Sequence, residues 1–520
     1  KCPRCGSRDI VRKIDVVRAL QELASEVDLV FIGTDPDTEG EKIGWDLKVL
    51  LEPYTREIKR VEFHEITRRA ILNAIRNPRD FNMKLVEAQI IRRVEDRWLG
   101  FTLSQKLWYD LWPYYCMKYL VEKKGLKIDC CNTINRNFSA GRVQTPVLGY
   151  IIERYEKAKK PDRIIIEVND GLLRIEMPYE YLDRLGIRRA RDLLGREALV
   201  EEIGVVEEEV NPLPPFTTDT LLAEASARYN MPSHRTMQIA QELFELGFIT
   251  YHRTDSTRVS DTGIAIARQY LQEKYGDRYV ELFKPRTWGV GGAHEAIRPT
   301  RPIDPDRLWE LIREGVIQPV RPLTRAHMMI YDLIFRRFIA SQMISAIVKK
   351  QKLRIKIDSF ETEIDRPIGV VRDGFLEIYR IITSENPIAS GKYTITMAEP
   401  RNPPLARFHD VIRWMKEQGI GRPSTYAKIV QTLLDRKYVA VTGRVKALMP
   451  TPRGMEVYKF LTKFYGDVVS VDTTRELEEK MRLVEEGKED YQSILGRIYD
   501  ELRTKVINID SSAWRKLVCG

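Results

Sequence analysis

The feature that most constrains the fold is the placement of β-rich sequence in two separate blocks, residues 162–216 and 346–400. Short β-rich segments alternate with turns in the first block, and polar and apolar residues alternate along the second. Between the blocks, residues 218–345 read as mainly helical. The pattern predicts one discontinuous β-rich domain that carries another domain as an excursion.

The ends of the chain add an α/β segment and helices. A strand over 27–32, a helix over 40–51 and a second strand over 58–63 are expected near the start, followed by one long helix over 81–108. The chain is too long for a single core. The predicted domains are 1–80 (α/β), 81–160 and 401–520 (two parts of a helical domain), 161–217 and 346–400 (the β-rich domain), and 218–345 (a helical domain between them).

Charge favours a polyanionic partner. The net charge is +10, and residues 401–450 contain ten Lys or Arg against three Asp or Glu. No apolar run approaches the roughly 18–20 residues of a membrane span, so no membrane partner is expected. Six cysteines are too few for a secreted disulfide framework, which favours the cytoplasm. The Glu-, Lys- and Arg-rich composition is typical of a thermophile.

The segment 248–256 carries a candidate nucleophile. On a strand, Tyr251 and Arg253 would share one face. A guanidinium beside a phenol favours the phenolate and stabilises charge on a phosphoryl group. The pair therefore suits attack on a phosphodiester, although an edge strand with a packed Tyr and a solvated Arg would show the same residues.

A second motif follows the first expected strand. Asp35, Asp37 and Glu39 alternate between that strand and the next helix, at the edge where parallel sheets bind ligands. Three converging carboxylates repel one another unless a hard divalent cation such as Mg²⁺ binds them. Acidic residues placed at a helix N-terminus explain one or two of the three.

Other motifs are individually weaker. His294, followed by Arg298 in a glycine-rich segment, suits proton transfer or phosphate binding, although an ordinary loop histidine would also fit. Two turns suit phosphate binding. The first, at 139–146, is expected to expose Arg142 and Gln144. The second, at 419–427, contains Ser424 and Thr425, either of which can cap a helix.

Cys2 and Cys5 form a CxxC knuckle, which is half of a tetrahedral Zn²⁺ site. The remaining cysteines do not complete it, so the partner pair is expected before residue 1, in a longer polypeptide. A redox CxxC is the alternative reading. No GxxxxGK[ST] motif occurs, so any dependence on ATP would need another part of that polypeptide.

Together these motifs resemble the type IA DNA topoisomerases. The acidic triplet is similar to the DxDxE motif of the family's Toprim domain, and five further motifs follow in the family's order. Within the family, the Toprim-like residues, His252 between the Tyr and the Arg, and the cysteine knuckle most resemble reverse gyrases. The residues that carry the resemblance are Asp35, Asp37, Glu39, Arg92, Arg93, Asp96, Ser139, Arg142, Gln144, Tyr251, Arg253, His294, Arg298, Arg422, Ser424 and Thr425.

The resemblance implies a fold and a reaction. The fold would be a multidomain α+β ring made of a partial Toprim domain, helical domains and a β-rich arch. Tyr251 would cleave one strand of single-stranded DNA through a 5′-phosphotyrosine and religate it, with Arg253, His294, Glu39 and Mg²⁺ assisting. The DNA contacts would come from residues of the long-helix, Ser139, Arg298 and Arg422 motifs. An upstream helicase-like ATPase of the same polypeptide would then bias strand passage toward positive supercoils.

Two other functions would fit the same motifs, and the sequence differs from the family pattern in two places. An ordinary relaxing type IA topoisomerase would share the motifs, and a non-catalytic DNA clamp would share the basic surface. The family's first Toprim strand, with its Glu and Lys, has no counterpart here. The aromatic and basic insertion at 109–137 is longer than the family pattern predicts.

Overall fold

A computed structural model of the chain describes residues 13–289 and 294–519. The chain divides into two compact units. The first contains the described residues of Lys1–Pro146 with Glu417–Gly421 and Glu456–Gly520, and the second contains Val147–Lys416 and Arg422–Met455. Within the described ranges, no helix combines the length and the apolar character that a membrane crossing requires.

The first unit begins with a small α/β substructure. Strands β1 (Leu29–Ile32) and β2 (Glu57–Arg60) pair in parallel, and α2 (Thr38–Leu51) connects them. Helices α1 (Lys13–Ser25) and α3 (Arg68–Arg76) flank this pair in the sequence. The expected strand, helix and strand are confirmed, although both strands are shorter than the apolar runs that predicted them.

One long helix, α4 (Met83–Lys106), forms the core of the same unit with the C-terminal helices. Its Ala88 and Ile91 pack against Leu477 and Met481 of α17 (Val471–Glu485) and Ile494 of α18 (Tyr491–Leu502). These buried apolar side chains recur every three or four residues, which is why the sequence predicted the long helix. The remaining elements of this end are α16 (Pro452–Tyr465), η6 (Gly466–Val468), η7 (Arg503–Ile507) and α19 (Ala513–Cys519).

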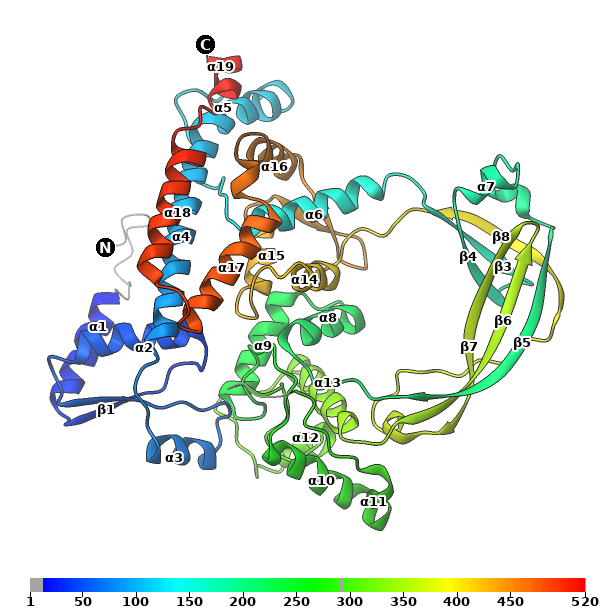
Figure 1. Cartoon of the computed structure of the whole chain (residues 1–520), viewed down its shortest axis with the longest axis horizontal. Helices are drawn as coiled ribbons and strands as arrows, with labels where there is room; N and C mark the ends of the chain where they lie inside the picture. The colour runs from blue at the N-terminus through cyan, green and yellow to red at the C-terminus, as the bar shows by residue number, and fades with distance from the viewer. Residues whose placement is uncertain (1–12, 290–293, 520) are drawn as a thin grey trace. The chain divides into compact units, whose positions relative to one another are not determined.

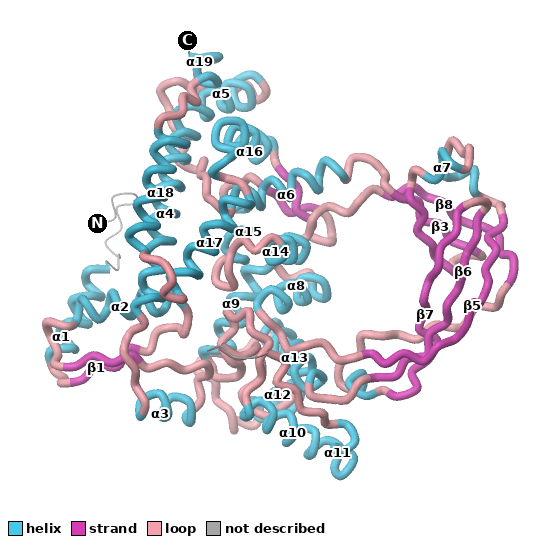
Figure 2. Tube along the Cα trace, in the orientation of Figure 1, coloured by secondary structure: helices cyan, strands magenta, loops and turns pink. Residues whose placement is uncertain are grey.

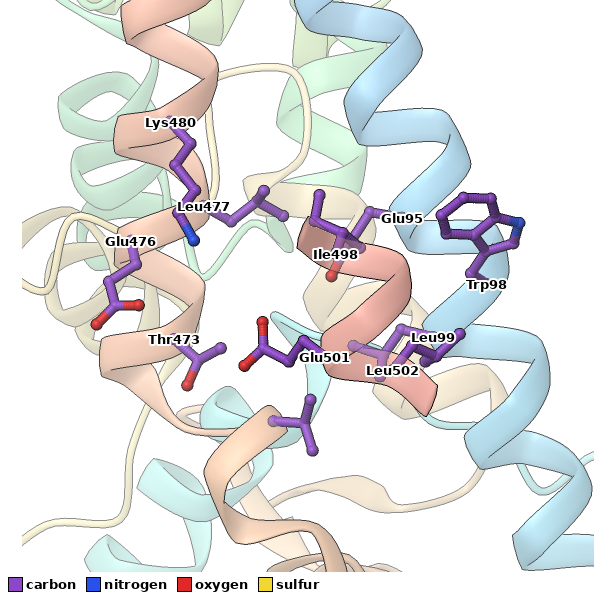
Figure 3. A pocket seen from close by; sticks show the side chains of 11 residues that line it. Glu95, Trp98, Leu99, Thr473, Glu476, Leu477, Lys480, Ile498, Glu501 and Leu502 are labelled. Atoms are coloured by element: carbon purple, nitrogen blue, oxygen red, sulfur yellow. The ribbon is translucent and has the colours of Figure 1, made fainter. Parts of the chain in front are cut away.

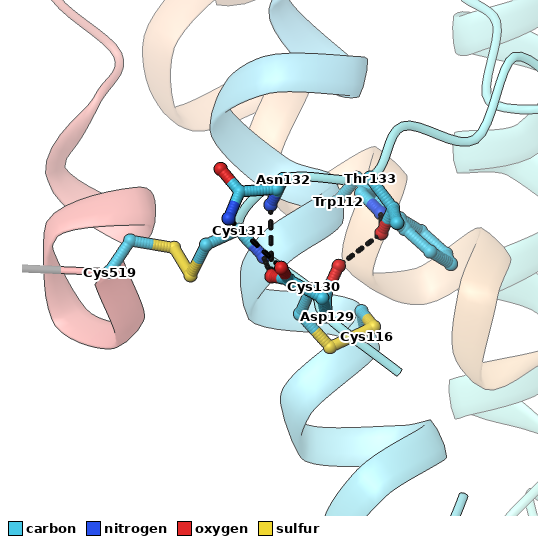
Figure 4. Close-up of a disulfide and its surroundings, with 8 residues drawn as sticks. All are labelled: Trp112, Cys116, Asp129, Cys130, Cys131, Asn132, Thr133 and Cys519. Carbon is cyan, nitrogen blue, oxygen red and sulfur yellow. Dashed lines mark hydrogen bonds between the residues drawn. A yellow bond between two sulfur atoms is a disulfide. The ribbon is translucent and has the colours of Figure 1, made fainter. Parts of the chain in front are cut away.

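The insertion at 109–137 continues α4 as irregular helix. Two π-helical segments, η1 (Leu107–Leu111) and η2 (Cys116–Glu122), enclose the short α5 (Trp112–Tyr115). Two disulfides, Cys116–Cys130 and Cys131–Cys519, then tie the following loop to η2 and to α19 (Figure 4). The number of cysteines in the sequence did not predict either pair.

The second unit is built on a six-stranded sheet in the order β4-β3-β8-β5-β6-β7 (Figures 1 and 2). Its long antiparallel strands are visible in magenta along the tube in Figure 2. The strands are β3 (Arg163–Val168), β4 (Leu173–Pro178), β5 (Glu197–Val210), β6 (Ala346–Ile357), β7 (Phe360–Arg372) and β8 (Gly391–Arg401).

The two β-rich blocks of the sequence meet in this sheet. Strand β3 of the first block pairs with β8 of the second, and β5 pairs with both β6 and β8. Buried side chains from both blocks, including Ile166, Val200, Leu353 and Ile395, form one core. The expectation of a discontinuous β-rich domain is therefore confirmed, while its boundaries stay predictions. Short helices α7 (Tyr181–Arg184) and η3 (Ala190–Leu193) lie between β4 and β5.

The stretch between β5 and β6 is helical, as the sequence predicted. Its elements are α8 (Thr218–Tyr229), α9 (Ser233–Glu245), α10 (Asp261–Tyr275), η4 (Gly276–Arg278), α11 (Tyr279–Leu282), α12 (Pro305–Arg313) and α13 (Arg325–Ser341). After β8 come α14 (Phe408–Glu417), α15 (Tyr426–Asp435) and the hairpin of β9 (Val439–Thr442) and β10 (Ala447–Pro450). Helix α6 (Gln144–Lys157) precedes β3, and η5 (Gly374–Glu377) follows β7.

Candidate active site

Tyr251 lies in an irregular segment of the second unit. A single antiparallel bridge joins Ile249 to Pro299 on one side. On the other side, the hydroxyl of Thr218 donates to the carbonyl of His252 at 2.7 Å. The strand expected around Tyr251 is therefore wrong, because isolated bonds to two neighbours replace a continuous ladder.

The Tyr251 side chain is 2% exposed. The half-buried Arg253 follows two residues later, and its Nη2 donates to Gln241 at 3.5 Å. The structure thus brings Tyr251, Arg253 and His294, three predicted site residues, into one region. The rings around Tyr251, with their centroid separations, are Phe244 at 5.2 Å, His252 at 5.5 Å and His294 at 6.4 Å.

A buried ion pair fixes the segment after His294. Arg298 donates through Nη2 and Nε to the two carboxylate oxygens of Glu295, at 2.6 and 3.0 Å. Burial acts to raise the pKa of Glu295, but the charge and hydrogen bonds of Arg298 outweigh it and the pKa is lowered. The Arg298 backbone also accepts from Thr250 N at 2.9 Å. Arg298 therefore connects the His294 and Tyr251 segments.

Arg298 is 1% exposed, so its guanidinium faces the interior of the protein. Contact between DNA and this side chain stays a prediction, and it requires the pair with Glu295 to open. A Cβ at Gly263 would lie 2.9 Å from the Cδ of Arg298, so glycine lets α10 approach the pair.

His252 is a buried residue that the motifs did not single out for a role. Burial, assisted by the charge of Arg253, lowers its pKa to about 3, so the imidazole is neutral at physiological pH. Neither of its ring nitrogens has a hydrogen-bond partner among the residues that the structure describes. His252 therefore contributes no positive charge beside Tyr251.

The acidic motif of the first unit forms a tight turn between β1 and α2. The carboxylate of Asp37 accepts from Gly40 N at 2.7 Å and so caps α2, while Thr34 Oγ1 donates to the Gly40 carbonyl at 2.7 Å. A Cβ at Gly40 would lie 2.1 Å from the Asp35 carbonyl oxygen. The turn holds Asp35, Asp37 and Glu39 half-buried at the carboxyl end of β1.

A buried network of ion pairs and hydrogen bonds stabilises this turn. Arg60 donates to the Asp35 carbonyl at 2.9 Å and pairs with Glu41 at 3.0 Å. Glu41 also accepts from Arg79 and from Asn82 N, at 2.8 and 2.7 Å. Burial acts to raise the pKa of Glu41, yet these donors outweigh it and the pKa lies below its ordinary value. The carboxylate therefore stays ionised and anchors both arginines.

The long-helix motif of α4 divides between the interior and the surface. Arg92 is buried and approaches Asp96 at 3.8 Å, whereas the side chains of Arg93 and Asp96 are about half exposed. Arg93 also pairs with Asp46 of α2 at 3.6 Å, which connects this motif to the helix that follows the acidic turn.

Arg142 is buried, so the expectation that it is exposed is wrong. Its guanidinium lies 3.2 Å from Glu95, 3.7 Å from Asp96 and 3.9 Å from Glu478. Burial is the largest cause that raises the pKa of Glu95, to about 7. The charge of Arg142 lowers this pKa, whereas the charges of Asp96 and Glu478 raise it further. The turn at 139–146 is thus attached to α4 and α17 through charge.

A cavity of about 40 Å³ lies beside Glu95, between α4, α17 and α18 (Figure 3). Trp98, Thr473, Lys480 and Glu501 contribute to its lining. This volume holds a few waters at most and is too small for a nucleotide base. The cavity therefore leaves room for water near the Glu95 carboxylate.

Two predicted phosphate-binding turns are locally ordered. Gln144 Nε2 donates to the Ser139 carbonyl at 3.5 Å. In the other turn, Arg422 N donates to the hydroxyl of Thr425 at 2.9 Å. Thr425 stands at the N-cap of α15 without a side-chain cap bond, and Ser424 is half-buried. The Thr425 hydroxyl, one of the two predicted capping groups, therefore accepts a hydrogen bond within the turn and does not cap α15.

Comparison with known proteins assigns the family. A family model described as DNA topoisomerase matches residues 80–496, and a Toprim domain model matches residues 7–66. The structure of full-length topoisomerase I from Thermotoga maritima superposes with a TM-score of 0.70 and 29% identity, over 96% of this chain and 81% of that one. The chain belongs to the type IA DNA topoisomerase family.

Sequence relatives of this topoisomerase include reverse gyrases. It is 47% identical to reverse gyrase of Pyrococcus furiosus over 96% of this chain and 39% of that protein. It is 45% identical to reverse gyrase 1 of Aquifex aeolicus over 94% of this chain and 40% of that protein. The chain therefore spans about two fifths of the length of these relatives.

The Toprim match implies a metal ion, and the donor set fits one. Three carboxylates on one turn are the hard oxygen ligands that Mg²⁺ prefers. In the described part of the topoisomerase, however, no group of three or more His, Cys, Asp or Glu side chains is already arranged around a common point for a metal. Cys2 and Cys5, the predicted zinc ligands, lie outside the described residues, as do residues 290–293 before His294.

The sequence missed the residues that support the topoisomerase motifs. Arg60, Glu41, Glu95 and Glu295 are ordinary charged residues in the sequence, and only burial reveals them. A signal existed for Glu41 and Glu295, because each follows a predicted site residue by one or two positions. For Arg60 the signal was an arginine within the expected strand over 58–63.

Proposed function

We propose that this chain is the strand-passing part of a reverse gyrase, with Tyr251 as its nucleophile. The observation that carries the proposal is the Tyr251 ring 6.4 Å from that of His294 and two residues before Arg253, in a segment fixed through Arg298 and Thr218. The similarity to reverse gyrases over nearly the whole chain supports it.

In the proposed reaction, Tyr251 Oη attacks the phosphorus of a phosphodiester in single-stranded DNA. The bond from phosphorus to the 3′ oxygen breaks, a 5′-phosphotyrosine forms, and the phenolic proton passes to solvent or to the leaving oxygen. Arg253 stabilises the phosphoryl charge, and His294 contacts phosphate. Because Tyr251 is buried here, groups around it must move before DNA can reach the hydroxyl.

Religation reverses these steps, so the exchange conserves ester bonds and needs no ATP. Mg²⁺ held by Asp35, Asp37 and Glu39 would supply charge that aligns the DNA ends. Arg60 and Glu41 position the turn that carries these carboxylates. Arg92, Arg93, Asp96, Ser139, Arg142, Gln144, Arg298, Arg422, Ser424 and Thr425 stay the predicted DNA-contacting set.

Covalent trapping on single-stranded DNA tests the nucleophile. An oligonucleotide labelled at its 3′ end is incubated with the chain, and the mixture is denatured. Tyr251→Phe should abolish the adduct and leave DNA affinity nearly intact, because one hydroxyl is removed. Tyr179→Phe, at an exposed tyrosine that directly follows β4, is the matched control. An adduct that persists in Tyr251→Phe places the nucleophile elsewhere, and a wild-type chain without any adduct favours the DNA clamp.

A supercoiling assay on the full-length polypeptide separates reverse gyrase from a relaxing topoisomerase. Reverse gyrase should introduce positive supercoils only with ATP, which an upstream helicase-like part would hydrolyse. Relaxation that is indifferent to ATP would identify the ordinary enzyme.

Metal analysis of the same polypeptide should find one Zn²⁺ bound through Cys2, Cys5 and a further cysteine pair, whereas a chain that starts at Lys1 should bind it weakly.

A further inference from the structure

The surface cations of this chain divide into paired and unpaired sets. Several exposed cations on and after α17 pair with neighbouring acids, as in Arg475–Asp472 at 3.0 Å, Arg482–Glu479 at 2.5 Å and Lys505–Glu501 at 2.7 Å. Around α15 and the β9–β10 hairpin, the exposed side chains of Lys428, Lys437, Arg444 and Lys446 form no ion pair with any acid of the described ranges. This second set, here called the hairpin cations, leaves a local excess of positive charge.

The hairpin presents two of these cations at its tip. Ala447 of β10 pairs with Thr442 of β9, so residues 443–446 form the turn. Gly443 has a φ of +70°, which the turn requires and glycine permits. Arg444 and Lys446 therefore flank Val445, whose side chain is 50% exposed. An apolar residue between two cations is suited to the sugars and phosphates of a groove edge.

The base of the hairpin is rigid. Leu448 N donates to the Ala406 carbonyl at 2.7 Å, and Thr451 N donates to the Tyr438 carbonyl at 2.9 Å. A Cβ at Gly454 would lie 2.2 Å from the same Tyr438 oxygen, so α16 starts in close contact with the start of β9. A fixed base holds the tip cations in one place, which lowers the entropy lost on binding.

Residues 426–450, which carry the hairpin cations, present no exposed aromatic ring for unpaired bases. Single-stranded nucleic acid is held by exposed aromatic rings on which bases stack. Here Tyr426 is 3% exposed and Tyr438 is fully buried, so both rings between residues 426 and 450 lie in the core. The charge therefore faces a phosphate backbone without a stacking platform, which favours a duplex.

We propose that the β9–β10 hairpin, with Lys428 and Lys437, binds the backbone of double-stranded DNA. Helix α15, labelled in Figure 1, carries Lys428, and Lys437 lies between α15 and β9. The four cations of this contact are not among the residues predicted to hold the cleaved single strand, and Lys428 lies three residues after Thr425 of that set. The contact does not depend on Tyr251 being the nucleophile, and it would hold duplex while a single strand is cut and passed.

Equilibrium binding to a fluorescent 20-base-pair blunt duplex tests this contact. The double variant Arg444→Ala/Lys446→Ala removes two exposed tip charges without touching the core. Each phosphate contact on duplex DNA contributes about −0.9 to the slope of log affinity against log salt. The variant should therefore bind the duplex roughly 10- to 100-fold more weakly near 0.1 M salt, with a slope shallower by about 1.8. Its affinity for a single strand of the same sequence should change less than about twofold.

The matched control is Arg482→Ala/Lys488→Ala, which removes the same charge from cations paired on and after α17. Duplex affinity of the control should stay within about twofold of the wild type. An unchanged slope in the hairpin variant overturns the proposal, and so does an equal loss for duplex and single strand or an equal loss in the control. Covalent trapping is run in parallel. Absence of an adduct in the wild type counts against Tyr251 as the nucleophile, whereas the duplex contact is decided by the binding measurements.

Discussion

At the scale of single residues, several arginines of the predicted DNA-contacting set point inward. Arg142 and Arg298 are each almost fully buried; Arg298 pairs with Glu295, and Arg142 lies within 4 Å of Glu95, Asp96 and Glu478. Buried charges persist only when they are paired, and removal of one partner leaves the other uncompensated. In the interior, therefore, these arginines first hold motifs together, and any contact with DNA has to compete with an existing ion pair.

The pH dependence of stability should report the environment of Glu95. Its pKa rises from 4.5 to about 7, chiefly through burial. Between these values the folded chain keeps a proton that the unfolded chain has lost, so the free energy of unfolding falls as pH rises from 4.5 through 7. The loss is at most about 3 kcal/mol. Glu95→Gln stays neutral, so urea denaturation across roughly pH 5 to 7.5 should show a smaller decline in this variant.

Glu476→Gln provides the control, because Glu476 lines the same cavity but is exposed. Its stability should follow the wild-type dependence on pH. Parallel curves for wild type and Glu95→Gln would show that Glu95 does not keep its proton in the folded state.

At the scale of elements, the turn between β1 and α2 depends on one glycine. A Cβ at Gly40 would meet the Asp35 carbonyl oxygen at 2.1 Å, and backbone atoms cannot move aside as a flexible side chain would. Gly40→Ala should therefore displace Asp35 and Asp37. We expect persistent covalent adducts after Mg²⁺ and salt are added, with religation slowed at least about tenfold, and a stability loss of about 1–3 kcal/mol.

Gly496→Ala in α18 is the comparison, since a Cβ at this position would meet no described atom within 4 Å beyond its own helix and chain neighbours. Alanine there should raise stability by about 0.5–1 kcal/mol. Normal religation in Gly40→Ala would contradict the link between this turn and the joining of DNA ends.

Elements with a strong period were predictable from the sequence, and contacts between distant residues were not. Alternation along β6 and β8 and the helical spacing in α4 predicted those elements, because burial of one face imposes the period. The Tyr251 segment lacks such a period, since isolated bonds to two neighbours hold it. The burial of Arg142 depends on Glu478, far along the chain, and no local pattern records that contact.

At the scale of the whole molecule, the cysteines add covalent links. Cys131–Cys519 closes a loop with a sequence separation of 388, and Cys116–Cys130 closes one of 14. In the chain-entropy account, a longer closed loop restricts the unfolded chain more, by about 6 kcal/mol against about 3. Replacement of Cys131 and Cys519 by serine should therefore lower the Tm by several degrees, and by more than replacement of Cys116 and Cys130.

Calorimetry of both variants and of the wild type with and without a reducing agent measures the effect. Reduction should lower the wild-type Tm toward that of a chain without the four cysteines. Identical Tm values in oxidised and reduced wild type would show that the bonds do not stabilise the fold.

The bond between Cys131 and Cys519 also makes most of the polypeptide a covalent circle. A single break of the backbone anywhere between these cysteines leaves both fragments joined, so a nicked protein keeps its full mass on a gel until it is reduced. The strands of the sheet, Tyr251 and the β9–β10 hairpin all lie on this circle. A backbone break between Tyr251 and the hairpin would therefore leave the two joined until the disulfide is reduced.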